Sequence, residues 1–73
     1  MIIKFHLYTE LGKFDSENIQ VSSEQYKNLI NLTKNYYTQG YEMFLPDGFL
    51  VATPEVVKKS ILTIEIIENE LQK

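Results

Sequence analysis

Hydrophobic and polar residues alternate along the first segment of the chain, residues 2–9. Such alternation predicts a β-strand with one buried face. The residues expected to face the core are Ile3, Phe5 and Leu7. The residues expected to face outward are Lys4, His6 and Tyr8. A polar stretch, residues 10–18, then predicts a loop, with Phe14 folded back onto the body, before a short second strand at residues 19–21.

A helix is predicted after Ser22, whose hydroxyl can accept a hydrogen bond from the first helical turn. Gln25, three residues later, completes a capping box. Residues at helical spacing then form one largely apolar stripe. Its members are Tyr26, Leu29, Ile30, Thr33, Tyr36 and Tyr37. Gly40 suits the left-handed conformation with which helices often end.

Two short segments, residues 41–45 and 49–53, flank the sequence Pro-Asp-Gly at 46–48. This arrangement predicts a β-hairpin, because Pro presets the first turn angle and Gly48 can take the positive φ of a bulge. A register that buries the odd-numbered residues of the first strand turns Phe44 outward.

The last segment has two interpretations that the pattern leaves open. Residues 53–55, Thr-Pro-Glu, predict a helix start, and apolar residues follow at helical spacing as far as Leu71. Residues 61–67, however, are rich in β-branched side chains and could form a strand after one short helical turn. We favour one long helix, because the cap, the length and a weak repeat of residues 21–27 at 52–58 agree.

The whole chain, residues 1–73, is therefore expected to be a single α+β domain. The favoured order is ββαββα, in which two helices cover one face of a four-stranded antiparallel sheet. The alternative order is ββαββ, a short helix and a fifth strand.

The amino-acid composition excludes several kinds of site and makes some kinds of partner unfavourable. The chain has no cysteine, which excludes disulfides and thiolate zinc sites and fits a reducing compartment, so we expect a cytoplasmic protein. The most apolar run, residues 61–67, is too short to span a membrane. All seven basic residues are Lys and the net charge is −3, so nucleic acid is an unfavourable main partner.

Few residues suggest catalysis. His6 is the only histidine, and as a general base it would need a substrate pocket and an orienting carboxylate. One histidine without cysteine does not make a conventional zinc site. We therefore expect no enzyme activity, no metal and no cofactor. The chain is rich in residues with AT-rich codons, such as Ile, Lys, Asn and Tyr, and has no Arg. In this composition, in its size and in its lack of catalytic groups, it resembles small phage-encoded accessory proteins in general. No sequence motif supports this resemblance.

Surface residues give the functional hypothesis. Tyr8, Tyr37 and Phe44 are aromatic residues expected at the surface, where such side chains favour protein contacts. An acidic end is formed by Glu65, Glu68 and Glu70. Such a patch can steer a basic partner.

Leu62 and Ile66 suggest self-association. In the helical interpretation these residues lie on the outer face of the last helix, where two large apolar side chains require a partner. A homodimer with paired C-terminal helices is then expected. In the strand interpretation this argument disappears.

The first functional hypothesis is thus a dimeric, non-enzymatic module that binds a protein, such as a phage-type inhibitor of a host protein. The second is a binder of a nucleotide-like small molecule, with its pocket between subunits and contacts from tyrosines and lysines. The third is a weak binder of single-stranded nucleic acid through aromatic stacking.

Overall fold

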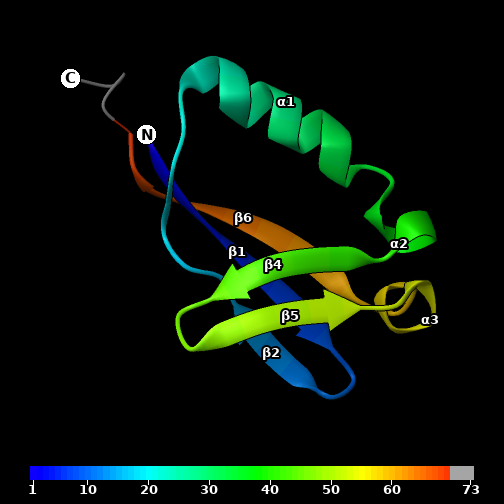
Figure 1. Ribbon diagram of the computed structural model, residues 1–73. Helices are drawn as coiled ribbons and strands as arrows, with labels where there is room; N and C mark the ends of the chain where they lie inside the picture. The colour runs from blue at the N-terminus through cyan, green and yellow to red at the C-terminus, as the bar shows by residue number, and fades with distance from the viewer. Residues whose placement is uncertain (70–73) are drawn as a thin grey trace.

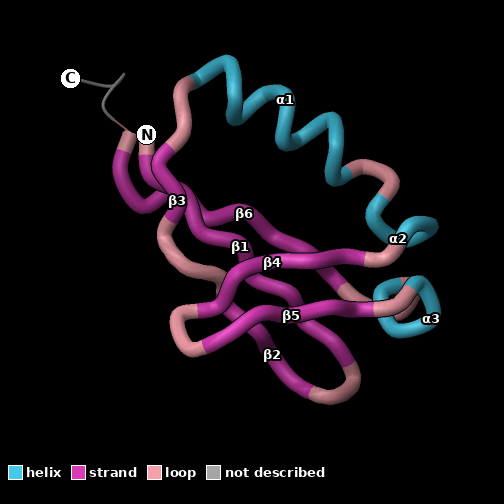
Figure 2. The backbone as a smooth tube through the Cα atoms, viewed as in Figure 1, coloured by secondary structure: helices cyan, strands magenta, loops and turns pink. Residues whose placement is uncertain are grey.

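The computed structural model describes residues 1–69 and has an α+β fold, as predicted (Figure 1). In chain order, the elements are β1 (Ile2–Thr9), β2 (Gly12–Asp15), β3 (Ile19–Gln20), α1 (Ser23–Thr33), α2 (Tyr36–Gln39), β4 (Tyr41–Leu45), β5 (Gly48–Ala52), α3 (Pro54–Val57) and β6 (Ile61–Glu68). The strands form two separate antiparallel sheets, which Figure 2 shows in magenta.

β1 is the centre of the larger sheet. β2 and β3 pair with successive parts of one edge of β1, and β6 pairs with the other edge. The predicted inward residues of β1 are all buried, namely Ile3, Phe5 and Leu7. β6 places Ile64 beside Phe5 and Leu62 beside Leu7, so both strands contribute to one apolar face.

Residues 61–68 form a strand, so the favoured long C-terminal helix is wrong and the alternative of a short helix and a strand is correct. The helix start at Pro54 is confirmed, but α3 ends at Val57, whose side chain is fully buried. The β-branched run then pairs with β1 along almost all of that strand, which provides main-chain bonds that an exposed helix would not give β1. Glu70 and Leu71 lie outside the described residues.

The segment predicted as a loop contains β2, which returns along β1 after a turn at residues 10–11. Gly12 has φ +136°, a conformation that other residues adopt only with strain. Ser16 follows β2 and is fully buried. Its polar groups are satisfied by Phe5: the Ser16 hydroxyl accepts a hydrogen bond from the N–H of Phe5 at 2.8 Å, and the N–H of Ser16 donates to the Phe5 carbonyl at 2.9 Å. Phe14 packs against the core, as expected.

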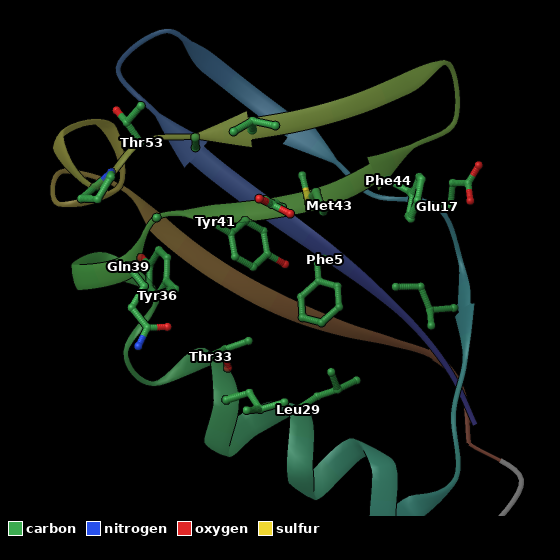
Figure 3. Close-up of a pocket in the computed structure, with 17 residues that line it drawn as sticks. Phe5, Glu17, Leu29, Thr33, Tyr36, Gln39, Tyr41, Met43, Phe44 and Thr53 are labelled. Carbon is green, nitrogen blue, oxygen red and sulfur yellow. The ribbon is translucent and has the colours of Figure 1, made fainter.

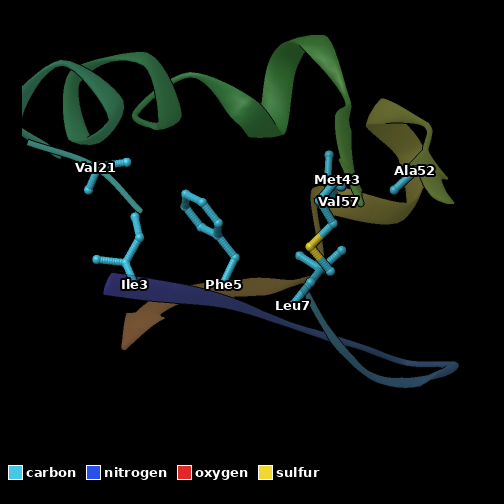
Figure 4. Close-up of a cluster of buried hydrophobic side chains, with 7 residues drawn as sticks. All are labelled: Ile3, Phe5, Leu7, Val21, Met43, Ala52 and Val57. Atoms are coloured by element: carbon cyan, nitrogen blue, oxygen red, sulfur yellow. The ribbon is translucent and has the colours of Figure 1, made fainter. Parts of the chain in front are cut away.

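The hairpin of β4 and β5 is confirmed, but it forms its own sheet and does not join β1. It packs across the apolar face of the larger sheet through Met43 and Ala52 (Figure 4). Phe44 is 67% exposed, as predicted from the register. The predicted positive φ at Gly48 is wrong, because Gly48 pairs directly with Leu45 and only residues 46–47 form the turn.

α1 begins as predicted. The N–H of Gln25 donates to the Ser22 hydroxyl at 3.1 Å, and the N–H of Ser22 donates to the Gln25 side chain at 2.8 Å. The helix ends earlier than predicted, at Thr33, whose hydroxyl donates back to the carbonyl of Ile30 at 3.0 Å. Such competing bonds weaken a helix. The chain forms one more short helical turn, α2, before Gly40. The φ of Gly40 is positive at +85°, as predicted, but its ψ of 179° is extended and differs from the left-handed helical conformation.

The core is small, and α1 contributes no fully buried residue to it. The buried apolar side chains, drawn in Figure 4, are Ile3, Phe5, Leu7, Val21, Met43, Ala52 and Val57. Within residues 1–69, no helix has the length and hydropathy needed to cross a membrane.

Candidate functional site

The main concave surface is a groove between α1 and β4, with a volume of about 820 Å³ (Figure 3). Phe5 of β1 lies at its floor. Leu29 and Thr33 approach from α1, and Tyr41 and Met43 approach from β4. The groove is thus built from three elements that are distant in the sequence.

Hydrogen bonds anchor the chain just before α1 and beyond its end. At its start, the chain is anchored where the N–H of Val21 donates to the Met1 carbonyl at 2.9 Å. Beyond its end, the hydroxyl of Tyr36 in α2 lies 3.2 Å from both the carbonyl and the hydroxyl oxygen of Ser60. Between these anchors, Leu29 is only partly buried and Leu32 is 73% exposed. The apolar stripe of α1 is therefore only partly covered.

Large apolar side chains continue from the groove onto its rim. Leu32 from α1, Phe44 from β4 and Val51 from β5 all line the groove and are exposed. The ring of Phe44 also packs edge-on against Phe49, with 4.9 Å between ring centroids. Contiguous exposed apolar surface of this kind marks interaction sites more often than scattered apolar residues do.

The floor and one wall of the groove are aromatic. The ring of Tyr41 packs edge-on against Phe5 at 6.2 Å and against Tyr36 at 6.0 Å. Burial raises the pKa of Tyr41 to about 12, so its phenol stays neutral at physiological pH. The charged residues among those that line the groove are Glu17 and Glu42, and no Lys or Arg is among them. The groove therefore combines an apolar interior with an acidic edge.

One edge of β4 faces away from β5 and has no strand partner within residues 1–69. The carbonyl of Phe44 lies on this edge, because it accepts the N–H of Glu17 at 3.0 Å. Main-chain groups alternate along a strand, so the N–H and carbonyl of Glu42 point to the same side. The groove thus presents main-chain donors and an acceptor as well as apolar surface.

A second cluster lies on the opposite, outer face of the larger sheet. His6 of β1 places Nδ1 2.5 Å from Oδ1 of Asp15 in β2, and Nε2 2.7 Å from Oε1 of Glu65 in β6. The hydrogen bond to Asp15, followed by the bond to Glu65, raises the pKa of His6. The bond from His6 is also the main reason that the pKa of Asp15 is lowered.

With a carboxylate at each ring nitrogen, His6 is suited to be a doubly protonated cation that joins three strands. Such an imidazolium has no free lone pair for a general base or a metal ligand. Residues 1–69 contain no group of three or more His, Cys, Asp or Glu side chains arranged to hold a metal ion.

The structure does not gather the residues that the sequence singled out into one surface. Phe44 is on the rim of the groove. Tyr37 on α2 is 47% exposed and Tyr8 on β1 is 42% exposed, and neither lines the groove. Leu62 packs against the core and Ile66 is 45% exposed, both from β6. Because β6 is a strand, the outer helix face proposed for these two residues does not exist.

Sequence reasoning missed Leu32, Glu42 and Val51 as groove residues. The sequence did carry a signal for two of them. Leu32 is an apolar residue outside the expected apolar stripe of the helix, and Val51 falls on the same outward side of the hairpin as Phe44. Large apolar residues at positions that a pattern assigns to solvent are candidates for contact surfaces.

No protein-family model, curated protein or solved structure matches this chain.

Proposed function

We propose that this protein is a non-enzymatic interaction module that binds an extended segment of a partner protein in the groove between α1 and β4. The observation that carries the proposal is the combination of an apolar groove with an unpaired strand edge along one wall. Extended peptides bind such edges through main-chain hydrogen bonds, while adjacent pockets accept alternate side chains.

The geometry of the groove supports a short, extended ligand. The N–H and carbonyl of Glu42 suit the main chain of one residue of an added strand, and the exposed rings of the rim suit its apolar side chains. The bond from Glu17 to the Phe44 carbonyl occupies the next acceptor along β4, so pairing is short and the apolar side chains supply much of the affinity.

The charges that line the groove support a ligand with basic residues. Glu17 and Glu42 line the groove without a basic counterpart, so a segment that carries Lys or Arg beside its apolar residues is favoured. The same carboxylates repel phosphate. They therefore count against the nucleotide-like ligand and the single-stranded nucleic acid that were the second and third hypotheses from the sequence.

A segment bound in this groove is withdrawn from its other contacts. An inhibitory role of the phage accessory type would follow directly from such binding, and it remains a prediction from sequence character. The partner we propose is defined by its chemistry: an extended, apolar polypeptide segment flanked by basic residues.

Selection from a random peptide library on immobilised protein tests the proposal. The wild-type protein should enrich peptides that combine large apolar residues with Lys or Arg. Phe44→Ser should lose most of this enrichment, because Phe44 is on the rim and is too exposed to support the core. Leu11→Ser is the matched control, since Leu11 is 82% exposed and does not line the groove.

A charge reversal gives the sharper test. For one enriched peptide labelled with a fluorophore, Glu42→Lys should weaken binding measured by anisotropy, and an analogue with its basic residues replaced by Glu should recover it. The proposal fails if no peptide is enriched, if Phe44→Ser binds as well as wild type, or if the reversal leaves the preferred charge unchanged.

A further inference from the structure

β6 is an outer strand of the larger sheet, and within residues 1–69 it pairs with β1 alone. It is eight residues long and contains neither Lys nor Pro, two residues that natural proteins place on edges to prevent strand addition. Its register irregularity falls only near its end, between Ile2 and Ile3 of β1. Ile61, Ile66 and Ile67 are among its exposed residues. This edge therefore has no second strand partner within residues 1–69 and lacks both of these protective residue types.

The direction of the main-chain groups on β6 follows from β1. The N–H and carbonyl of Phe5 both bond to Ser16, on the side of β1 away from β6. The neighbouring residues of β1, Lys4 and His6, therefore face β6, and they pair with Glu65 and Thr63. By the same alternation, the main-chain groups of the even-numbered residues of β6 face outward. Those residues are Leu62, Ile64 and Ile66.

We propose that two copies of this chain pair through β6 as antiparallel strands, around a two-fold axis at Ile64. Each Ile64 then exchanges two main-chain hydrogen bonds with the partner subunit's Ile64. Leu62 lies opposite the partner's Ile66, so three outward-facing residues of each strand find a partner. Two sheets thus become one continuous sheet, and the interface closes because it is the same on both chains.

Charge selects this register. An axis at Glu65 gives an overlap of the same length, but it places two Glu65 carboxylates directly opposite one another, which is unfavourable. With the axis at Ile64, Glu65 lies opposite the partner's Thr63. The carboxylate of Glu65 is bonded to His6 at 2.7 Å, so it points toward β1 and away from the free edge of β6.

The proposed interface also covers exposed apolar side chains. On the outer face of the joined sheet, Ile61, which is 66% exposed, lies opposite the partner's Ile67. On the inner face, Leu62 lies opposite the partner's Ile66. Self-association through Leu62 and Ile66, which the sequence led us to expect from a helix, is thus proposed through strand pairing.

The inference is independent of the proposed groove, because no residue of β6 lines that groove. Peptide binding and self-association are measured separately, so either can fail without the other.

The mass in solution is the first test. Sedimentation equilibrium of the wild-type chain should give twice the 8.6 kDa of one chain, with reversible dissociation on dilution. A monomer at every concentration, or a series of larger assemblies, would overturn the proposal.

A matched pair of variants at Thr63 tests the register. Thr63→Glu places like charges opposite Glu65 at two symmetric positions and should weaken the dimer by roughly 2- to 30-fold. Thr63→Lys places opposite charges there and should retain or strengthen it. Within one chain Thr63 lies beside His6, whose two ring nitrogens are already bonded to Asp15 and Glu65, so the folding of both variants is checked directly.

Circular dichroism of both variants establishes that they are folded, so that a loss of the dimer in Thr63→Glu is distinguished from unfolding. Equal dissociation constants for Glu and Lys would overturn the register, since the axis at Glu65 places residue 63 opposite the partner's Ile67. The difference between the variants should decrease at high salt.

Discussion

At the scale of single residues, the sequence predicted which face of the sheet His6 lies on but not which side chains bond to it. The alternation of β1 places it correctly on the outer face, between Lys4 and Tyr8. The carboxylates that surround it come from Asp15 on β2 and Glu65 on β6. Only strand pairing brings these groups together, so an expected half-exposed residue becomes a charged link across three strands.

This link predicts a pH dependence of stability. The pKa of His6 is raised in the folded state, so its contribution is present below its ordinary value of 6.5 and is lost as the pH rises through the raised pKa. The pKa of Asp15 is lowered, so its contribution is present above 3.8 and is lost as the pH falls through the lowered pKa. Lys13, whose Nζ is 3.5 Å from Asp15, adds to the lowering.

The free energy of unfolding of wild type relative to His6→Gln should therefore be greatest between these two values and should decline on either side. Urea unfolding followed over a range of pH measures the difference. A difference that is constant with pH, or that grows at alkaline pH, would contradict the assigned role of His6.

At the scale of elements, local signals fix where structure starts better than where it ends. Ser22 and Pro54 begin helices as predicted, but both helices end early. The joint at Gly40 is more constrained, because its φ is +85° and a Cβ there would lie 2.8 Å from the carbonyl oxygen of Ala52. Gly40 thus sets the direction in which the chain enters β4 and, with it, one wall of the groove.

Gly40→Ala should destabilise the fold by about 1–3 kcal/mol, through strain at positive φ and the close contact with the main chain. Gly48→Ala is the matched control, because Gly48 has no positive φ and no atom within 4 Å of an added Cβ. It should stay within about 0.5 kcal/mol of wild type. Denaturant unfolding measures both, and equal effects at the two positions would contradict this account.

At the scale of the whole molecule, the core is small. Within residues 1–69, seven apolar side chains are buried, and α1 covers the sheet only partly. A domain of this size typically has a stability of about 4–11 kcal/mol. An uncovered groove and an unpaired sheet edge are therefore considerable parts of its surface, and binding to either would add stability.

Leu7→Ala should cost about 2–5 kcal/mol, a large part of the total, because Leu7 is fully buried at the centre of the core. Leu11→Ala, at a position that is 82% exposed, should have little effect. Thermal unfolding should show a decrease of about 10 °C or more for Leu7→Ala alone. Similar melting temperatures for the two variants would show that the core is placed incorrectly.

The sequence by itself determined the features that depend on near neighbours. Alternation specified the inward face of β1, the capping box specified the start of α1, and Pro46 with Asp47 specified the hairpin turn. Each of these rests on interactions within a few residues, so no distant partner is needed to recognise them. The α+β class follows from them.

Only the tertiary structure decided the rest. Residues 61–67 carry a helix start upstream and β-branched side chains within, and the choice of strand required the open edge of β1, some 60 positions earlier in the chain. The groove likewise depends on the separation between α1 and β4, and no local sequence pattern predicts that separation. Pairing and packing are chosen by the competition among all surfaces of the folded chain, and that competition joins residues that are far apart in the sequence.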